Sequence, residues 1–153
     1  MDARSKVSDL ADHIGFWMRL VSNNVSHSFA RKLENSGVTV AEWVVLREMY
    51  GAGMTSPGTI AEITGHTKGA ISKLVTRLLE KGLVSRKEAS GDRRFQDIKL
   101  TAKGTALVPK LAALADENDE TFFSVLTKAE RQALSATLKK IATSHQLAKA
   151  PLE

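Results

Sequence analysis

Side chains suited to binding a polyanion gather in one stretch of the chain, between His66 and Lys99. This stretch holds nine lysines and arginines against four acidic residues, so its formal charge of +5 equals that of the whole chain. Elsewhere, thirteen basic residues balance thirteen acidic ones. Such asymmetry indicates a polyanion-binding surface. A solvated basic face without a partner is the alternative interpretation.

Part of this charge lies on one face of a predicted helix over residues 67–80. Its apolar residues recur at helical spacing, at Ile71, Leu74, Val75, Leu78 and Leu79, and form a single stripe. At 100° per residue, the opposite side is small, hydroxylic or cationic, which suits phosphates and base edges. The predicted DNA contacts, which include residues of the following segment, are Lys68, Gly69, Ser72, Lys73, Thr76, Arg77, Arg86, Arg93 and Arg94.

A second, shorter helix is expected just before this one. Ser56 and Pro57 have the residue types of an N-cap and a first helical position, and Thr67 can cap the helix that follows. Gly65 lies in a tight turn between the two. Two helices joined by a short glycine-containing turn predict a helix-turn-helix, although many helical hairpins share this pattern.

A predicted hairpin makes this interpretation more specific. Gly82 is expected to end the helix, residues 83–88 form a strand, residues 89–92 a turn and residues 95–100 the returning strand. Arg93 and Arg94 lie at its tip, and Asp92 is expected to orient an arginine by a salt bridge. Helix, helix and cationic hairpin together predict a winged helix-turn-helix.

The alternation of apolar residues along the returning strand is imperfect. Phe95, Ile98 and Leu100 do not all fall on one face of a regular strand. This irregularity predicts a bulge or twist near Asp97.

Long helices are expected on both sides of the winged segment. Residues 8–36 carry apolar residues at three- and four-residue steps up to Gly37, and Thr39 with Glu42 has the spacing of a capping box. Residues 102–124 form another helix, in which Pro109 predicts a kink or a late start. The winged domain alone is too small to bury these stripes, so the terminal helices are expected to dimerise.

The hairpin and its exit resemble the MarR family of bacterial transcription regulators. Asp92, Arg94, Leu100 and Thr101 match the family's D-x-R-x5-L-T spacing, and residues 78–84 match L-x-x-K-G-L-V. The arrangement of long helices on either side extends the resemblance over nearly the whole chain.

This resemblance implies a mainly α fold with a small β-wing. It further implies a winged helix-turn-helix at residues 38–101, flanked by a dimerisation region at residues 1–37 and 102–153. The implied function is a cytoplasmic homodimer that binds a palindromic double-stranded DNA operator as a ligand-relieved repressor. The alternative is a winged helix that binds other proteins, or an architectural DNA binder without sequence preference.

Members of this family often bind small aromatic anions between the winged domain and the dimerisation helices. By that resemblance, His13, Trp17, Trp43 and Arg47 are the candidate effector contacts. Indole rings can stack on an aromatic ligand, and a guanidinium can hold a carboxylate. The alternative is that both tryptophans belong to the core and that Arg47 pairs with an acid.

Several other classes of protein are excluded or disfavoured. The chain contains no cysteine, so disulfides and thiolate metal sites are excluded. It has no apolar run of membrane-spanning length, and its acidic start does not resemble a signal peptide. No catalytic motif appears, so we expect neither an enzyme nor a cofactor. His13 and His27 stand about 21 Å apart along one helix, too far to share a metal within one chain, and we predict no metal site.

Overall fold

The computed structural model describes residues 7–88 and 96–147. The described part is mainly helical, with one two-stranded antiparallel sheet. The elements are η1 (Leu10–Asp12), α1 (Ile14–Leu33), η2 (Glu34–Ser36), α2 (Val40–Met49), α3 (Pro57–Thr64), α4 (Lys68–Glu80), β1 (Val84–Glu88), β2 (Gln96–Leu100), α5 (Ala102–Phe122) and α6 (Lys128–Ser144). The mainly α fold with a small β-wing is therefore confirmed.

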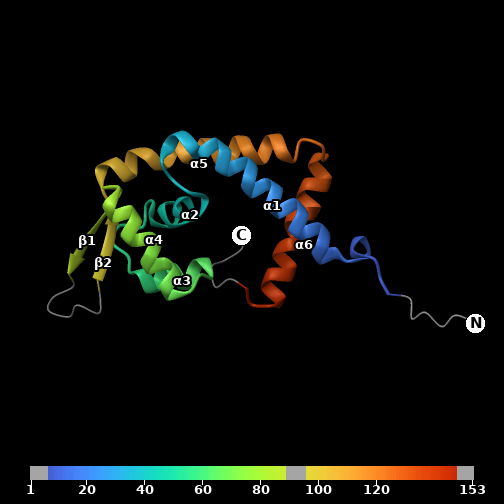
Figure 1. Cartoon of the computed structure of the whole chain (residues 1–153), viewed down its shortest axis with the longest axis horizontal. Helices are drawn as coiled ribbons and strands as arrows, with labels where there is room; N and C mark the ends of the chain where they lie inside the picture. Colours follow the sequence, from blue (N-terminus) through green and yellow to red (C-terminus); the bar gives the residue numbers. More distant parts are fainter. Residues whose placement is uncertain (1–6, 89–95, 148–153) are drawn as a thin grey trace, which may run out of the picture.

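The molecule is elongated, with the sheet at one end and the start of α1 and helix α6 at the other (Figure 1). Between the two ends, α1 and α5 pack against each other, and α2 packs against both. Helices α2, α3 and α4 pack together next to the sheet. Fully buried apolar side chains from these elements form one core: Leu33, Val45, Leu46, Ile60, Ile71, Leu78, Ile98 and Leu111.

The first predicted helix is interrupted near its start. A short 3₁₀ turn at Leu10–Asp12 precedes α1, because His13 takes an extended conformation (φ −101°, ψ 126°). The last turn before Gly37 is also 3₁₀. Gly37 has φ 73°, a left-handed conformation that glycine adopts without steric cost, and it ends the segment as predicted.

The two helices of the predicted helix-turn-helix begin at the expected caps. The Ser56 hydroxyl accepts the Thr59 N–H at 3.1 Å, and the Thr67 hydroxyl accepts the Ala70 N–H at 3.1 Å. The turn between them contains Gly65 at φ 73°. Helix α4 then ends with two backbone bonds, from Gly82 N–H to Leu79 and from Leu83 N–H to Leu78, which orient the chain into β1.

The predicted bulge near Asp97 is wrong. The two strands pair without interruption from Val84↔Leu100 to Glu88↔Gln96. The irregular spacing came from Phe95, which lies outside the described residues, whereas Ile98 and Leu100 alternate regularly within β2. The sequence also did not predict that Thr55 extends the sheet through two hydrogen bonds with Ile98, at 2.9 and 2.7 Å.

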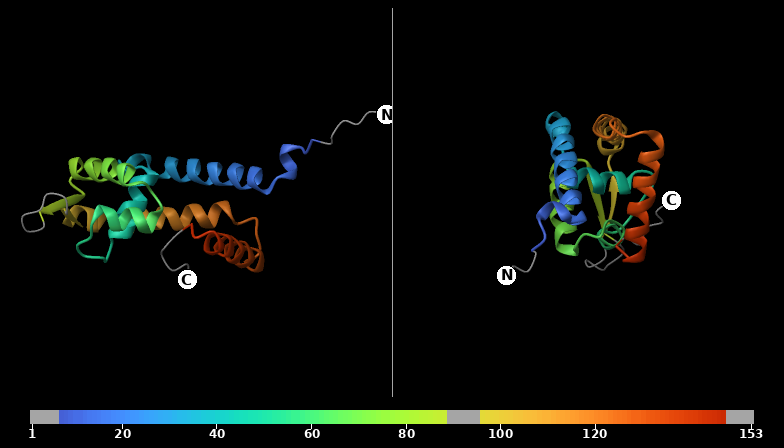
Figure 2. Two further views of the ribbon diagram at one scale, coloured as in Figure 1. Left: turned by 90° about the horizontal axis from the view of Figure 1, so that it is seen from below. Right: turned by 90° about the vertical axis from the view of Figure 1, so that its right-hand side faces the viewer.

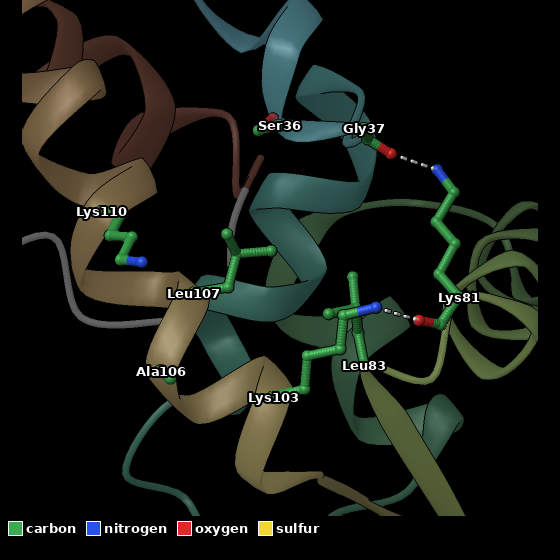
Figure 3. A pocket seen from close by; sticks show the side chains of 8 residues that line it. All are labelled: Ser36, Gly37, Lys81, Leu83, Lys103, Ala106, Leu107 and Lys110. Atoms are coloured by element: carbon green, nitrogen blue, oxygen red, sulfur yellow. Dashed lines mark hydrogen bonds between the residues drawn. The ribbon is translucent and has the colours of Figure 1, made fainter.

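The predicted capping box at the start of α2 is only half formed. The Thr39 hydroxyl accepts the Glu42 N–H at 3.1 Å, but the Glu42 carboxylate does not bond back to the helix start. Its side chain is 1% exposed and accepts a 2.6 Å bond from the ammonium of Lys81, at the end of α4. The same ammonium donates to the Gly37 carbonyl at 2.7 Å (Figure 3). The attraction between two opposite charges favours the Lys81 ammonium over a neutral backbone N–H, which explains why Glu42 turns to Lys81.

Helix α5 starts where the sequence predicts, not late. The Thr101 hydroxyl accepts the Gly104 N–H at 3.1 Å, and the helix runs through Pro109 to Phe122. Gly104 is buried against the backbone of Leu83, the residue just before β1. A Cβ at this position would overlap the Leu83 carbonyl oxygen, which accepts the Thr101 N–H at 3.0 Å. Glycine is therefore required where α5 crosses the start of β1.

We expect Gly104→Ala to lower the free energy of unfolding by about 2 kcal/mol or more, because the new methyl group can be accommodated only if backbone moves. Gly69→Ala is the matched control, since Gly69 also lies in the first turn of a helix and a Cβ there meets no atom within 4 Å. It should be neutral or stabilising by up to about 1 kcal/mol. Urea unfolding followed by circular dichroism compares the two, and equal stabilities would contradict this account of Gly104.

We expect Lys81→Met to cost about 2–3 kcal/mol, because it leaves a buried carboxylate without its cation. The cost falls below that of a fully buried pair, since the Lys81 side chain is 37% exposed. Replacing both partners, as Glu42→Leu with Lys81→Met, should recover most of the loss. Lys103→Met, which removes a lysine that has no acidic partner in the described part of the chain, should cost less than about 1 kcal/mol. Urea unfolding of the four variants measures these differences, and a double variant as unstable as Lys81→Met would refute the ion-pair explanation.

Candidate nucleic-acid interface

Helix α4 separates an apolar face from a polar one as the sequence predicts. Ile71, Leu74, Val75 and Leu78 are buried, and Leu79 is partly buried. All six candidate contacts on this helix are exposed: Lys68, Gly69, Ser72, Lys73, Thr76 and Arg77. Apart from Glu80 at its C-terminal end, the exposed face therefore consists of cations, hydroxyls and one glycine, and the other side of the helix is anchored in the core.

Several of these residues line a shallow depression on the helix surface. Ser72, Lys73, Thr76, Arg77 and Glu80 border a volume of about 400 Å³. The Thr76 hydroxyl donates to the Ser72 carbonyl at 2.9 Å and keeps its acceptor capacity. Glu80 is the acidic exception and lies at the C-terminal end of the row. The arrangement offers donors along most of the helix and a single carboxylate at its end.

The charges on this face are not neutralised within the described part of the chain. None of Lys68, Lys73 and Arg77 forms an ion pair with another described residue. Solvated surface lysines and arginines commonly have acidic neighbours, whereas a polyanion-binding surface keeps its positive charge for the ligand. The uncompensated cations thus favour a phosphate-bearing partner.

The wing adds a further cation beside this helix. Arg86 is exposed on β1, opposite Ile98 of β2. Arg93, Arg94 and Asp92 lie outside the described residues, so their predicted roles at the tip stay predictions. The strands that carry the tip are held in place by the buried side chains of Val84 and Ile98 and by the hydrogen bonds of Thr55.

The four candidate effector contacts do not meet in one pocket of a single chain. The Trp17 indole N–H donates to the Ala11 carbonyl at 2.9 Å, and the ring is half exposed near the start of α1. Trp43 packs edge-on against Phe29, with ring centroids 6.2 Å apart. Phe29 lies twelve residues beyond Trp17 on α1, or about 18 Å along the helix. The two indoles are therefore too far apart to hold one small ligand between them.

The other two candidate effector contacts have local partners. His13 lies at the start of α1, with its Nδ1 3.0 Å from the Asp9 carbonyl oxygen. The Arg47 guanidinium lies 5.9 Å from the centre of the Tyr50 ring, and no acid within residues 7–88 and 96–147 forms an ion pair with it. Ligand binding by these four residues stays a prediction that the geometry of one chain does not support.

A second notable surface is apolar and lies at the far end of the molecule. Ile14, Trp17, Met18, Leu20 and Val21 of α1 are 42–77% exposed. Helix α6 has no buried residue, and its stripe of Leu134, Leu138 and Ile141 is 39–41% exposed.

Side chains of α1 and α6 line a groove of about 510 Å³ whose walls are mostly apolar. Figure 2 shows these two helices apart from each other, with α1 extending away from the winged part and α6 following the far end of α5. A stripe this continuous on two helices indicates an interface with another chain.

Within residues 7–88 and 96–147, no group of three His, Asp or Glu side chains could hold a metal ion. Among the helices that the structure describes, none combines the length and apolar character that a membrane span requires.

Comparisons with known proteins agree with this geometry. Residues 36–94 match a model of the MarR family. A transcriptional regulatory protein for the hcr operon of Thauera aromatica is 27% identical over 133 residues, which cover 86% of this chain and 80% of that protein.

Two solved structures give further comparisons. A mutant MarR of E. coli in complex with operator DNA shares 26% identity and a TM-score of 0.79, over 88% of this chain and 99% of that one. The organohalide-sensing regulator RdhR-CbdbA1625, bound to 2,4-dichlorophenol, has a TM-score of 0.80 at 18% identity, over 96% and 90% of the two chains, and so supports the fold alone.

The exposed cationic helix, the two-stranded wing and these comparisons lead to one conclusion: residues 36–94 match the MarR family of transcription regulators, and the chain shares the fold of solved MarR structures over most of its length.

Proposed function

We propose that the protein is a homodimeric repressor that binds a palindromic double-stranded DNA operator and is released by a small ligand. The observation that carries the proposal is the face of α4, where Lys68, Lys73 and Arg77 are exposed and have no acidic partner among the described residues. In a helix-turn-helix, the second helix enters the major groove. Helix α4 holds that position here, with its apolar side fixed in the core.

We assign different tasks to the helix and the wing. Lys73, Thr76 and Arg77 are placed to reach base edges, where lysine and arginine recognise guanine. Arg86 of β1, with Arg93 and Arg94 at the predicted tip, would contact phosphates or the adjacent minor groove, and Asp92 would orient an arginine. Phosphate contacts fix the register of the protein, and base contacts select the sequence.

The apolar surface of α1 and α6 supports the proposed homodimer. The groove between them is lined by Trp17, Val21, Val25 and Leu138, among others, and one chain leaves it open to solvent. A second copy presents the same stripes, so a two-fold arrangement lets each chain cover the other. Two copies of α4 related by this axis read the two halves of an inverted repeat, which is why we propose a palindromic operator.

Release by a ligand is supported by the fold alone. The organohalide-sensing relative binds 2,4-dichlorophenol, which is a small phenol. In the proposed dimer, the two winged domains can take more than one arrangement. A ligand that binds one arrangement more tightly than another favours it, which changes the distance between the two α4 helices and therefore the affinity for the operator.

Leu138→Asp should convert the dimer into monomers, because it places a carboxylate in the apolar groove. We expect the dissociation constant of the dimer to rise at least about 30-fold, the equivalent of about 2 kcal/mol for a lost leucine contact. Ala136→Asp, on the opposite side of the same helix and also exposed, is the matched control. Sedimentation equilibrium should give twice 16.6 kDa for the parent and the control. A parent protein that sediments as a monomer would refute the dimer.

Substitutions on α4 and on the wing should separate sequence reading from phosphate contact. Lys73→Ala or Arg77→Ala should cost about 1–3 kcal/mol on a duplex selected from random DNA and should relax the choice of base at one position. Arg94→Ala should weaken binding to all duplexes alike and reduce the salt dependence by about one contact. Fluorescence anisotropy with operator variants at two salt concentrations measures both effects, with Lys139→Ala on α6 as the control. If Arg94→Ala loses sequence preference while Lys73→Ala and Arg77→Ala keep it, the wing reads the bases and α4 contacts the phosphates, the reverse of our assignment.

A further inference from the structure

A pocket at the junction of α4, β1 and α5 is lined by three lysines. Lys81, Lys103 and Lys110 surround it, with Ser36 and Gly37 on one side and Leu83, Ala106 and Leu107 between the cations (Figure 3). Its volume is about 490 Å³, within the range typical of small-molecule sites. It shares no lining residue with the depression along α4 or with the groove between α1 and α6.

The positive charge of this pocket is only partly compensated. Glu42 pairs with Lys81, and no described residue forms an ion pair with Lys103 or Lys110. The Lys103 ammonium donates to the Lys81 carbonyl at 3.2 Å, a neutral partner that leaves its charge in place. Lys81 itself uses two of its three N–H donors, on Gly37 and Glu42. The pocket therefore offers a net charge of about two and free N–H donors, which match a dianion.

The spacing of the lysines favours convergence on one group. Lys103 and Lys110 are seven residues apart, so they lie on the same face of α5 about 10.5 Å apart along its axis. Figure 3 shows them on either side of Leu107, with Lys81 across from them at the end of α4. Long, flexible lysine stems can bring ammonium groups from both turns onto one anion.

The lining also defines the rest of the ligand. None of the eight lining residues is aromatic, so an aromatic ring would find no partner to stack on. None is an arginine, so the planar two-bond recognition of a carboxylate is missing, whereas lysine binds phosphate well as a point charge. Leu83, Ala106 and Leu107 provide a small apolar floor that suits a short alkyl group.

We propose that this pocket is a binding site for a small phosphate monoester with a short aliphatic body. The same phosphate chemistry could come from the DNA backbone, whose phosphates are diesters with a single charge. A monoester carries close to two charges at neutral pH. The two sources can therefore be separated by probes of different charge. The inference does not depend on the proposed DNA binding, and its test contains no DNA.

The experiment titrates the full chain with n-butyl phosphate at constant ionic strength and follows backbone amide signals by NMR. The amides of Gly37, Leu83 and Leu107 should shift together with a single dissociation constant. Inorganic phosphate, which lacks the alkyl group, should bind at least about threefold more weakly. Dimethyl phosphate, the backbone-like diester, and butyrate, which has one charge, should each bind at least about tenfold more weakly.

Variants test whether the named lysines form the site. Lys103→Gln and Lys110→Gln should each weaken n-butyl phosphate binding about tenfold, and Ala106→Glu should abolish it by adding a carboxylate to the pocket. All three positions are exposed, so the fold should be retained, and the amide spectrum verifies this. Lys140→Gln on α6 removes one exposed charge elsewhere and should change the dissociation constant less than twofold.

Three results would overturn the proposal. The first is the absence of pocket shifts at n-butyl phosphate concentrations up to about 50 mM, which is about ten times a dissociation constant of about 5 mM. The second is binding of dimethyl phosphate as tight as that of n-butyl phosphate. The third is a weakening of binding by Lys140→Gln equal to that caused by Lys103→Gln and Lys110→Gln. The second result would identify a contact for the DNA backbone, and the third only a general attraction of anions to a basic protein.

Discussion

The constraint on which the rest of the structure depends is apolar surface that one chain cannot bury. Helix α6 has no buried residue, and the first half of α1 exposes Trp17 and its apolar neighbours. The free-energy cost of exposing apolar side chains to water grows in proportion to the exposed apolar area. The proposed second chain covers these stripes and, by the symmetry of the contact, fixes the distance between two copies of α4. In this proposal, association of the chains and recognition of an inverted repeat are two results of one interface.

The terminal helices of the proposed dimer can position α4 only if α4 is held firmly to them. The Lys81 ammonium provides one such link, because it joins the end of α4 to the Gly37 carbonyl, at the end of the α1 segment, and to the buried Glu42 of α2. Gly104 provides another, since the close crossing of α5 over Leu83 ties the start of the wing to the long helix. Both contacts lie where the winged part meets the terminal helices, next to the proposed phosphate site. A ligand there would contact the elements that hold α4 in place.

The sequence predicted those features that local rules control. Ser56 and Thr67 cap their helices, Gly37, Gly65 and Gly82 end theirs, and the stripe from Ile71 to Leu78 turns the cations of α4 outward. It failed where contacts between distant residues decide. Glu42 has the spacing of a capping box, but Lys81, 39 residues away, offers a stronger partner. The bond of Thr55 to β2 likewise depends on packing, which no local pattern encodes.

The central claim is that two chains present two α4 helices to one inverted repeat. Selection of duplexes from random DNA with the full chain, followed by native mass spectrometry of the selected complex, tests it most directly. The account predicts an inverted repeat with half-sites about 10 base pairs apart or a multiple of that. It also predicts two chains per duplex and a preference of at least about a thousandfold over random DNA. Selected duplexes without a common sequence, or one chain bound to a single half-site, would contradict it.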